Sequence, residues 1–321
     1  MFSYLFRRLN LLVITGFILT IISFMLTFWS NKDVSEEYSY INLYITYMSN
    51  ILDGDWGASI VDQQPLLRTA LIAFASTLEL CFITSITATI IGVPLGVTAG
   101  LKRNGLLDYS IMSVALIGLA LPVFWLAILF IVIPVSLGLS IPIDGDISPI
   151  YEVPVISGFL LVDTVLASDL YNLDAFFNRL AHLILPSTVL SFFLITEVIR
   201  LTRHSITQVM ETNYIKAAYA NGLTKVQIIF RHALKNALPP ILPQIILQLS
   251  TIFSFAMAIE IVFSSQGMGG WLYSSIKVGD YQALPVSLLI ISFFILCSNI
   301  AIDILIMLIS PIKRKSLYVD K

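Results

Sequence analysis

Four acidic residues fall inside strongly apolar stretches of this chain: Glu79, Glu197, Glu260 and Asp303. A carboxylate in such a place is costly to bury, so it either lines a polar path or pairs with another helix. Glu79 and Glu260 lie towards the ends of their stretches, and Glu197 stands three residues before Arg200. Interfacial or helix-pairing roles are therefore favoured for these three. Asp303 lies deepest, and for it a pathway role and a pairing role are equally open.

Sequence motifs for covalent or metal-assisted chemistry are missing. The chain contains no G-x-x-x-x-G-K-[ST] phosphate loop, no G-x-S-x-G and no H-E-x-x-H. The three histidines lie far apart, and the two cysteines, Cys81 and Cys297, sit in apolar stretches as small buried residues. The glycine-rich GMGGW, residues 267–271, is interpreted as a turn. We expect no catalytic residue, no metal site and no cofactor in this chain.

A basic segment interrupts the apolar chain: NYIKAAYANGLTKVQIIFRHALKNALPP, residues 213–240. Asn213 can cap a short alanine-rich helix, Gly222 can end it in a left-handed conformation, and Thr224 can cap a second helix. That second helix has apolar residues at helical spacing, namely Val226, Ile229, Ala233 and Ala237. The pattern predicts a helical hairpin that a partner backbone could approach closely. An amphipathic connector lying on the membrane fits the periodicity equally well.

The elements that position these residues must be membrane helices. Hydrophobic residues make up 57% of the 321 and charged residues 12%, with a mean hydropathy of +0.90. A soluble domain carries about 25% charged residues, and a membrane helix needs about 20 apolar ones. We expect an all-α polytopic membrane protein with six transmembrane helices: Leu9–Ser30, Ser76–Gly100, Ile111–Gly138, Arg179–Ile199, Pro239–Phe263 and Leu284–Ile309.

The distribution of Lys and Arg orients these spans, because cytoplasmic segments are enriched in both. With both termini inside, the inner segments hold 14 of the 18 basic residues: Arg7, Arg8, Lys102, Arg103, Arg200, Arg203, Lys216, Lys225, Arg231, Lys235, Lys313, Arg314, Lys315 and Lys321. The same rule explains the positive charge of residues 213–240, so this charge does not indicate nucleic-acid binding. The first span lacks a cleavage site, so we expect an uncleaved helix and not a signal peptide.

Several stretches resemble binding-protein-dependent ABC transporter permeases. KAAYANG, residues 216–222, followed by HALKNALPP, is similar to their cytoplasmic EAA loop. Lys216 replaces the usual glutamate and the proline pair falls late, as is typical of the oligopeptide and dipeptide branch. Further matches to that branch are GDWGAS (54–59), TLELCFITSITATIIGVPLGVTAG (77–100), LPVFWLAIL (121–129) and EIVFSSQGMGGWLYSSI (260–276). In the last, Gln266 stands in place of proline. The length and the acidic second outer segment are most similar to a peptide-transport permease.

The resemblance implies a type I ABC importer permease (MetI-like) fold in the bacterial cytoplasmic membrane. Residues 1–73 would hold the first span and an extracytoplasmic segment. Residues 74–309 would form the permease domain, with an extracytoplasmic insertion at about 139–178 and the coupling loop at about 204–237. Residues 310–321 would be a cytoplasmic tail. The residues that would dock on an ATPase are Lys216, Ala217, Ala218, Gly222 and Leu223.

The implied partners are a second homologous permease, two ABC ATPase subunits that hold ATP and Mg, and an extracytoplasmic substrate-binding protein. The expected substrate is a peptide, with cationic antimicrobial peptides as one option, and the expected function is import. Three alternatives stay open. The first is a permease for polyamines or other cationic solutes, including an exporter. The others are a non-transporting membrane scaffold and a self-contained ion channel, although a channel needs no ATPase dock.

Overall fold

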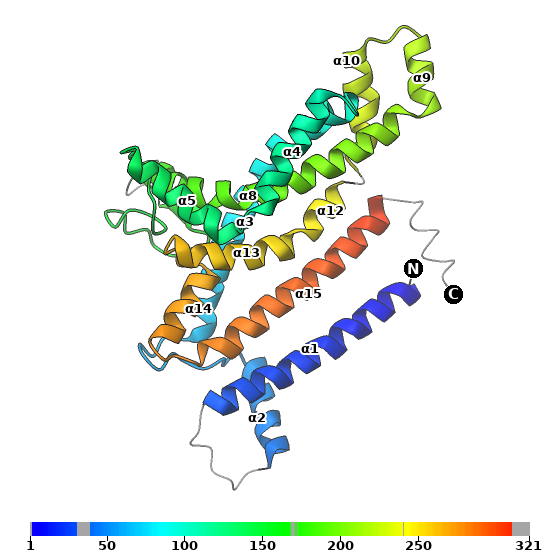
Figure 1. Ribbon diagram of the computed structural model, residues 1–321. Helices are drawn as coiled ribbons and strands as arrows, with labels where there is room; N and C mark the ends of the chain where they lie inside the picture. The colour runs from blue at the N-terminus through cyan, green and yellow to red at the C-terminus, as the bar shows by residue number, and fades with distance from the viewer. Residues whose placement is uncertain (1, 31–38, 168–170, 172, 240, 310–321) are drawn as a thin grey trace.

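The computed structural model describes residues 2–30, 39–167, 171, 173–239 and 241–309 (Figure 1). Within these residues the protein is built from helices, and its one β-bridge joins Ala58 to Pro65. The all-α prediction is therefore confirmed. The expected tail, residues 310–321, and Pro240 of the proline pair lie outside the described residues.

Two long helices, α3 (Leu66–Leu101) and α8 (Asp174–Met210), form the centre of the bundle and run parallel. Their close approach depends on Gly92, Gly96 and Gly100, which recur every fourth residue and so share one face of α3. A Cβ on Gly96 would lie 2.5 Å from the Cβ of Thr202. Small residues at this spacing allow membrane helices to pack backbone against backbone.

The expected third span, residues 111–138, is not a single helix. It is divided into α4 (Leu106–Ala120) and α5 (Val123–Ser136), which are bent by 98° relative to each other. The break falls at Leu121-Pro122, where Leu121 is extended at φ −85° and ψ 135°. The ring of a proline disfavours the helical conformation in the residue before it. A sequence window that scores only hydrophobicity misses this break.

The expected fifth span, residues 239–263, is also divided. Its helices are the six-residue α12 (Leu242–Leu247) and the 14-residue α13 (Leu249–Val262). Among the described residues, four helices are long and apolar enough to cross a membrane, or up to five if the bent pair α4 and α5 forms one span. The six predicted spans are therefore not confirmed.

The remaining helices flank this centre. α1 (Phe2–Ser30) packs against α15 (Ala283–Ile309), and α2 (Tyr40–Leu52) lies at the end of this pair. A hairpin follows α8 at the opposite end of the molecule (Figure 1). Its elements are α9 (Asn213–Ala220), α10 (Lys225–Ile228), the π-helical turn η1 (Ile229–Ala233) and α11 (Leu234–Ala237). The last two short helices are α6 (Leu160–Leu166) and α14 (Met268–Lys277).

Candidate coupling site

The tip of the hairpin is closed by a left-handed glycine. Gly222 has φ +80°, the conformation predicted for it, and nothing lies within 4 Å of where its Cβ would be. The Leu223 N–H donates to the Ala218 carbonyl at 3.2 Å, and the Gly222 N–H donates to the Tyr219 carbonyl at 3.0 Å. This pair of bonds is a Schellman motif, which satisfies the free carbonyls at the end of α9. The tight turn therefore has a local cause.

The helix starts agree in part with the sequence analysis. Thr224 caps α10 and forms a capping box with Gln227, as its side chain and that of Gln227 each bond to the backbone of the other residue. The predicted cap of α9 is wrong by one residue, because Asn213 is already helical and Thr212 occupies the extended cap position.

The second arm of the hairpin, residues 225–237, contains the π-helical turn η1, which changes the face that this arm buries. The predicted apolar set included Val226 and Ile229, but the buried residues are Ile228, Ala233 and Ala237. The π turn inserts one extra residue between Ile228 and Ala233, so their spacing is five and not four. Val226 consequently faces outward and is 63% exposed.

The predicted docking residues divide into two groups. Lys216, Ala217 and Gly222 lie on the surface of the hairpin. Ala218 is buried, and Leu223 is half-buried. These two pack in the tip core, a small apolar cluster formed by Ile215, Ala218 and Ile228 with Val209, Met210 and Leu223 around it. Ala218 and Leu223 therefore shape the hairpin without offering much surface.

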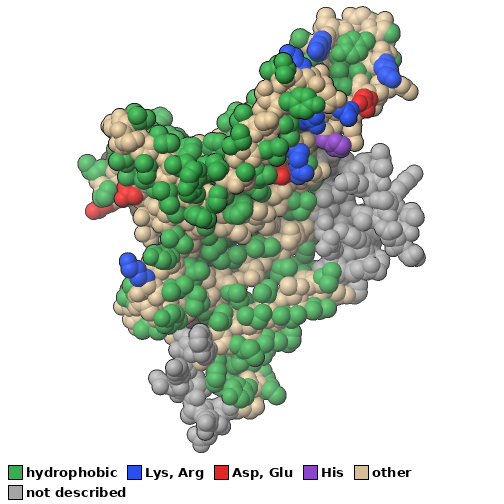
Figure 2. All heavy atoms as spheres, viewed as in Figure 1, with side chains coloured by type: hydrophobic (Ala, Val, Ile, Leu, Met, Phe, Trp, Pro, Cys, Tyr) green, Lys and Arg blue, Asp and Glu red, His purple; other side chains and the backbone are tan. Residues whose placement is uncertain are grey.

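Sequence reasoning missed the large apolar side chains that the hairpin exposes. They are Tyr214, Tyr219, Val226 and Phe230, and Phe230 is 70% exposed. Figure 2 shows Lys and Arg side chains gathered at this end of the molecule, beside apolar ones. The aromatic residues were visible in the sequence, but of these three only Phe230 lies in the π turn, which the sequence did not reveal. An exposed apolar group within a basic surface is suited to binding another protein.

The root of the hairpin is fixed to the bundle. Ala233 and Ala237 are buried against Ile206 of α8, with Val97 and Leu101 of α3 around them, and we call this cluster the root core. The Ser205 hydroxyl donates to the Ala237 carbonyl at 2.9 Å. The hairpin is therefore attached to both central helices at its root.

A buried ionic cluster lies at the other end of the central helices. Arg179 is 2% exposed, and its Nε donates to Glu79 Oε1 at 2.7 Å. Its Nη1 donates to the carboxylate and to the carbonyl of Asp146, both at 2.9 Å. The other Glu79 oxygen accepts the Leu161 N–H at 2.8 Å. Glu79 thus joins α3 to α8 and to α6, and Asp146 brings in the segment between α5 and α6.

Glu260 is the second buried acid and organises the turn before α14. Its carboxylate accepts the Thr77 hydroxyl at 2.6 Å and the Gly269 N–H at 2.8 Å. A Cβ at Gly267 would fall 2.1 Å from the same carboxylate, so any side chain there would push the Glu260 carboxylate out of its position. Glu260 therefore fastens the glycine-rich GMGGW segment to α3. In these positions Glu79 connects helices to one another, and Glu260 connects a turn to a helix.

The other predicted acids have different surroundings. Glu197 pairs with Arg200, whose side chain is mostly exposed. The side chain of Asp303 lies outside the described residues, so its role stays a prediction. Sequence reasoning missed the two-pronged pair between Arg203 and Asp108, which ties α8 to α4. Among the described residues, no group of three or more His, Cys, Asp or Glu is placed to hold a metal ion.

Comparison with known proteins places this geometry in a family. Residues 92–315 match the model of the family described as binding-protein-dependent transport system inner membrane component. A chain of the MetNI methionine ABC transporter, in an inward-facing conformation, aligns with a TM-score of 0.56 at 18% identity, over 77% of this chain and 98% of that one. This likeness shows the fold alone, and the MetI-like permease fold is confirmed.

Curated relatives match over nearly the whole length. The chain is 36% identical to the putrescine export system permease SapB of Escherichia coli K12, over 99% of both chains. It is 35% identical to the peptide transport system permease SapB of Salmonella typhimurium, also over 99% of both. It is 31% identical to the di/tripeptide permease DppB of Pseudomonas aeruginosa, over 97% of this chain and 98% of that one. The chain therefore belongs to the binding-protein-dependent transport system inner membrane component family, as a multi-pass permease subunit of an ABC transporter whose ATPase is a separate partner.

Proposed function

We propose that this permease imports peptides, and that its hairpin is the dock for the ATPase. The observation that carries the docking role is the hairpin itself. It has its own tip core, it exposes apolar side chains among lysines, and its root packs against both central helices. Within this hairpin Lys216, Ala217 and Gly222 supply surface, while Ala218 and Leu223 hold the turn in shape. Closure of the ATPases would then move the helices as rigid bodies.

The proposed assembly pairs this chain with a second homologous permease, two ABC ATPase subunits carrying ATP and Mg, and an extracytoplasmic binding protein. The proposed division of the chain is a first span with an outer segment (1–73), a permease domain (74–309) and a tail (310–321). The assembly is supported by the family, whose members work with ATPase and binding-protein partners.

Phe230→Asp is expected to weaken the association of the permease with its ATPase by about tenfold or more, since exposed aromatic anchors contribute about 2 kcal/mol or more at interfaces. Co-purification of the ATPase with the full-length permease measures this. Asn236→Asp is the matched control, because it places the same charge on an exposed residue of α11. Equal ATPase recovery with Phe230→Asp and with Asn236→Asp would contradict the docking role.

Both termini and the hairpin are proposed to be cytoplasmic. In intact cells, a membrane-impermeant thiol reagent should label the Lys225→Cys variant no more than the parent chain. The same reagent should label Lys277→Cys, at the end of α14. Both positions are exposed, so accessibility within the protein does not separate them. The two native cysteines supply the background, and Cys81 is buried. Strong labelling at Lys225→Cys would reverse the topology and remove the docking model.

A second substrate class has support from one relative, because the Escherichia coli K12 SapB is named a putrescine export permease. The assembled transporter in proteoliposomes would distinguish the two. Peptide import predicts that ATP hydrolysis rises with peptide and binding protein on the side opposite the ATPase. Polyamine export predicts stimulation by putrescine on the ATPase side, without a binding protein. A rise with putrescine alone would overturn the peptide proposal and leave the docking role intact.

A further inference from the structure

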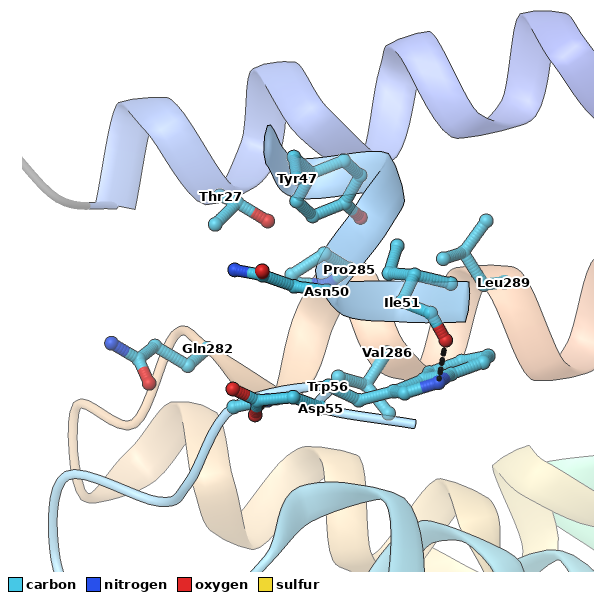
Figure 3. Close-up of a pocket in the computed structure, with 11 residues that line it drawn as sticks. Thr27, Tyr47, Asn50, Ile51, Asp55, Trp56, Gln282, Pro285, Val286 and Leu289 are labelled. Atoms are coloured by element: carbon cyan, nitrogen blue, oxygen red, sulfur yellow. Dashed lines mark hydrogen bonds between the residues drawn. The ribbon is translucent and has the colours of Figure 1, made fainter. Parts of the chain in front are cut away.

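A cavity of about 200 Å³ lies between α1, α2 and the start of α15, at the end of the molecule away from the hairpin (Figures 1 and 3). Its polar lining residues are Thr27, Tyr47, Asn50, Asp55, Trp56 and Gln282. Figure 3 shows the Asn50, Asp55 and Gln282 side chains around one side of this space. We call it the polar chamber.

The polar chamber has the chemistry of a cation site. Asp55 is the charged residue among its lining residues, and Asp55 Oδ1 accepts the Gly57 N–H at 3.1 Å. Burial raises the pKa of the Tyr47 hydroxyl, which therefore stays neutral. The Trp56 indole is held in place because its Nε1 donates to the Ile51 carbonyl at 3.2 Å. A carboxylate beside two aromatic rings favours an ammonium group.

An apolar groove of about 650 Å³ continues from the polar chamber between α1, α3 and α15. The two spaces share Ile51, Trp56 and Leu289 in their linings. On α15 the groove extends from Leu289 to Cys297, which is about 12 Å at 1.5 Å per residue. One leaflet of a bilayer has a hydrocarbon depth of about 15 Å, half of the whole core. The groove is therefore about as deep as a single leaflet.

We propose that the polar chamber and the groove together bind one aminophospholipid, a phospholipid with a primary ammonium in its headgroup. The ammonium lies at Asp55 between Tyr47 and Trp56, and an acyl chain fills the groove beside Gly16. A Cβ on Gly16 would have nothing within 4 Å, so the middle of α1 leaves open space for that chain.

The depth of the groove and the charge of the polar chamber together favour a lipid over a protein helix or a free amine. A helix of the second permease subunit would need a contact along the whole span, about 30 Å, and not along one leaflet. A free amine would occupy the polar chamber and leave the groove without an apolar partner. A lipid whose headgroup carries only a negative charge would bring that charge to Asp55, which repels it. The site is independent of the transported substrate.

Lipid retention by the full-length purified protein tests the proposal. After incubation with equimolar phosphatidylethanolamine and phosphatidylglycerol of identical acyl chains, native mass spectrometry should show a preference for phosphatidylethanolamine. Asp55→Asn should reduce that retention by about threefold, the effect of losing a charge contact at an exposed carboxylate. Asp53→Asn, an exposed acid outside the lining, is the matched control and should keep the preference. Equal retention of both lipids, or an unchanged Asp55→Asn, would overturn the proposal.

The groove is tested separately. Gly16→Phe should fill it and displace the lipid, whereas Ile18→Phe places the same aromatic ring at an exposed position of α1 outside the lining. A photoreactive benzoylphenylalanine at position 16, in the assembled transporter, should give an adduct with the mass of a phospholipid. An adduct with the second permease would show that a helix covers the groove. Displacement of the lipid by soluble ethanolamine would show that the polar chamber binds a free solute. Either result would refute the lipid assignment.

Discussion

Gly96→Val is expected to destabilise the protein by about 3 kcal/mol or more and to remove most of it from the membrane. A Cβ at this position would lie 2.5 Å from the Cβ of Thr202 and 2.9 Å from the Ile199 carbonyl oxygen, so α3 and α8 must separate. Overpacking a close contact costs about 1–3 kcal/mol, and here a backbone atom is among the clashing atoms. Thermal unfolding of the full-length protein in detergent, together with its yield from membranes, measures the effect.

The control for Gly96→Val is Thr98→Val, which places the same side chain on the same helix at an exposed position. It should change the unfolding temperature little. Combining Gly96→Ala with Thr202→Gly should recover part of the stability lost in Gly96→Ala alone, because it removes the nearest clash but leaves the Ile199 carbonyl. If Gly96→Val melts like the parent, the close approach of α3 and α8 is wrong.

Arg179→Met is expected to cost about 3–5 kcal/mol, the loss seen when one partner of a buried ion pair is removed. The cost comes mostly from Glu79 and Asp146, whose carboxylates lose their cationic partner with little access to water. Adding Glu79→Gln to Arg179→Met should therefore recover part of the loss. Thermal unfolding of the purified full-length protein is again the measurement.

Arg103→Met is the matched control for Arg179→Met. Arg103 pairs with Glu211, but their side chains are 50% and 68% exposed, and exposed pairs contribute about 0–1 kcal/mol. If the two variants lose equal stability, or if Glu79→Gln makes Arg179→Met worse, then the buried cluster does not hold α3, α8 and the neighbouring loops together.

Local features of the hairpin could be predicted from the sequence. Gly222 and Thr224 are recognisable because a left-handed turn and a helix cap depend on a few adjacent residues. The π turn at Ile229–Ala233 could not be predicted, because it depends on how the second arm packs against Ile206. That one inserted residue sets the five-residue spacing between the buried Ile228 and Ala233.

Only part of the buried polar network around Glu79 and Glu260 could be predicted from the sequence, for a similar reason. Glu79 and Glu260 stand out as acids in apolar stretches, but their partners come from distant positions: Arg179 lies 100 residues from Glu79, and Thr77 lies 183 from Glu260. Arg179 is the first residue of the fourth expected span, where a basic residue is normally hydrated, so nothing in the sequence indicated that it is buried. By contrast, the break at Leu121-Pro122 was readable from proline stereochemistry and was missed by counting apolar residues alone.

The tip core and the root core bury different residues of the hairpin, and Val209 and Met210 of α8 pack against both. Ile215, Ala218 and Ile228 pack in the tip core, while Ala233 and Ala237 pack in the root core, and most of the π turn lies between them. Substitutions on the outer surface of the tip therefore leave the attachment to α3 and α8 intact. Under the proposed docking role, exchanging the outer surface of the tip should change which ATPase binds, while the root still contacts α3 and α8.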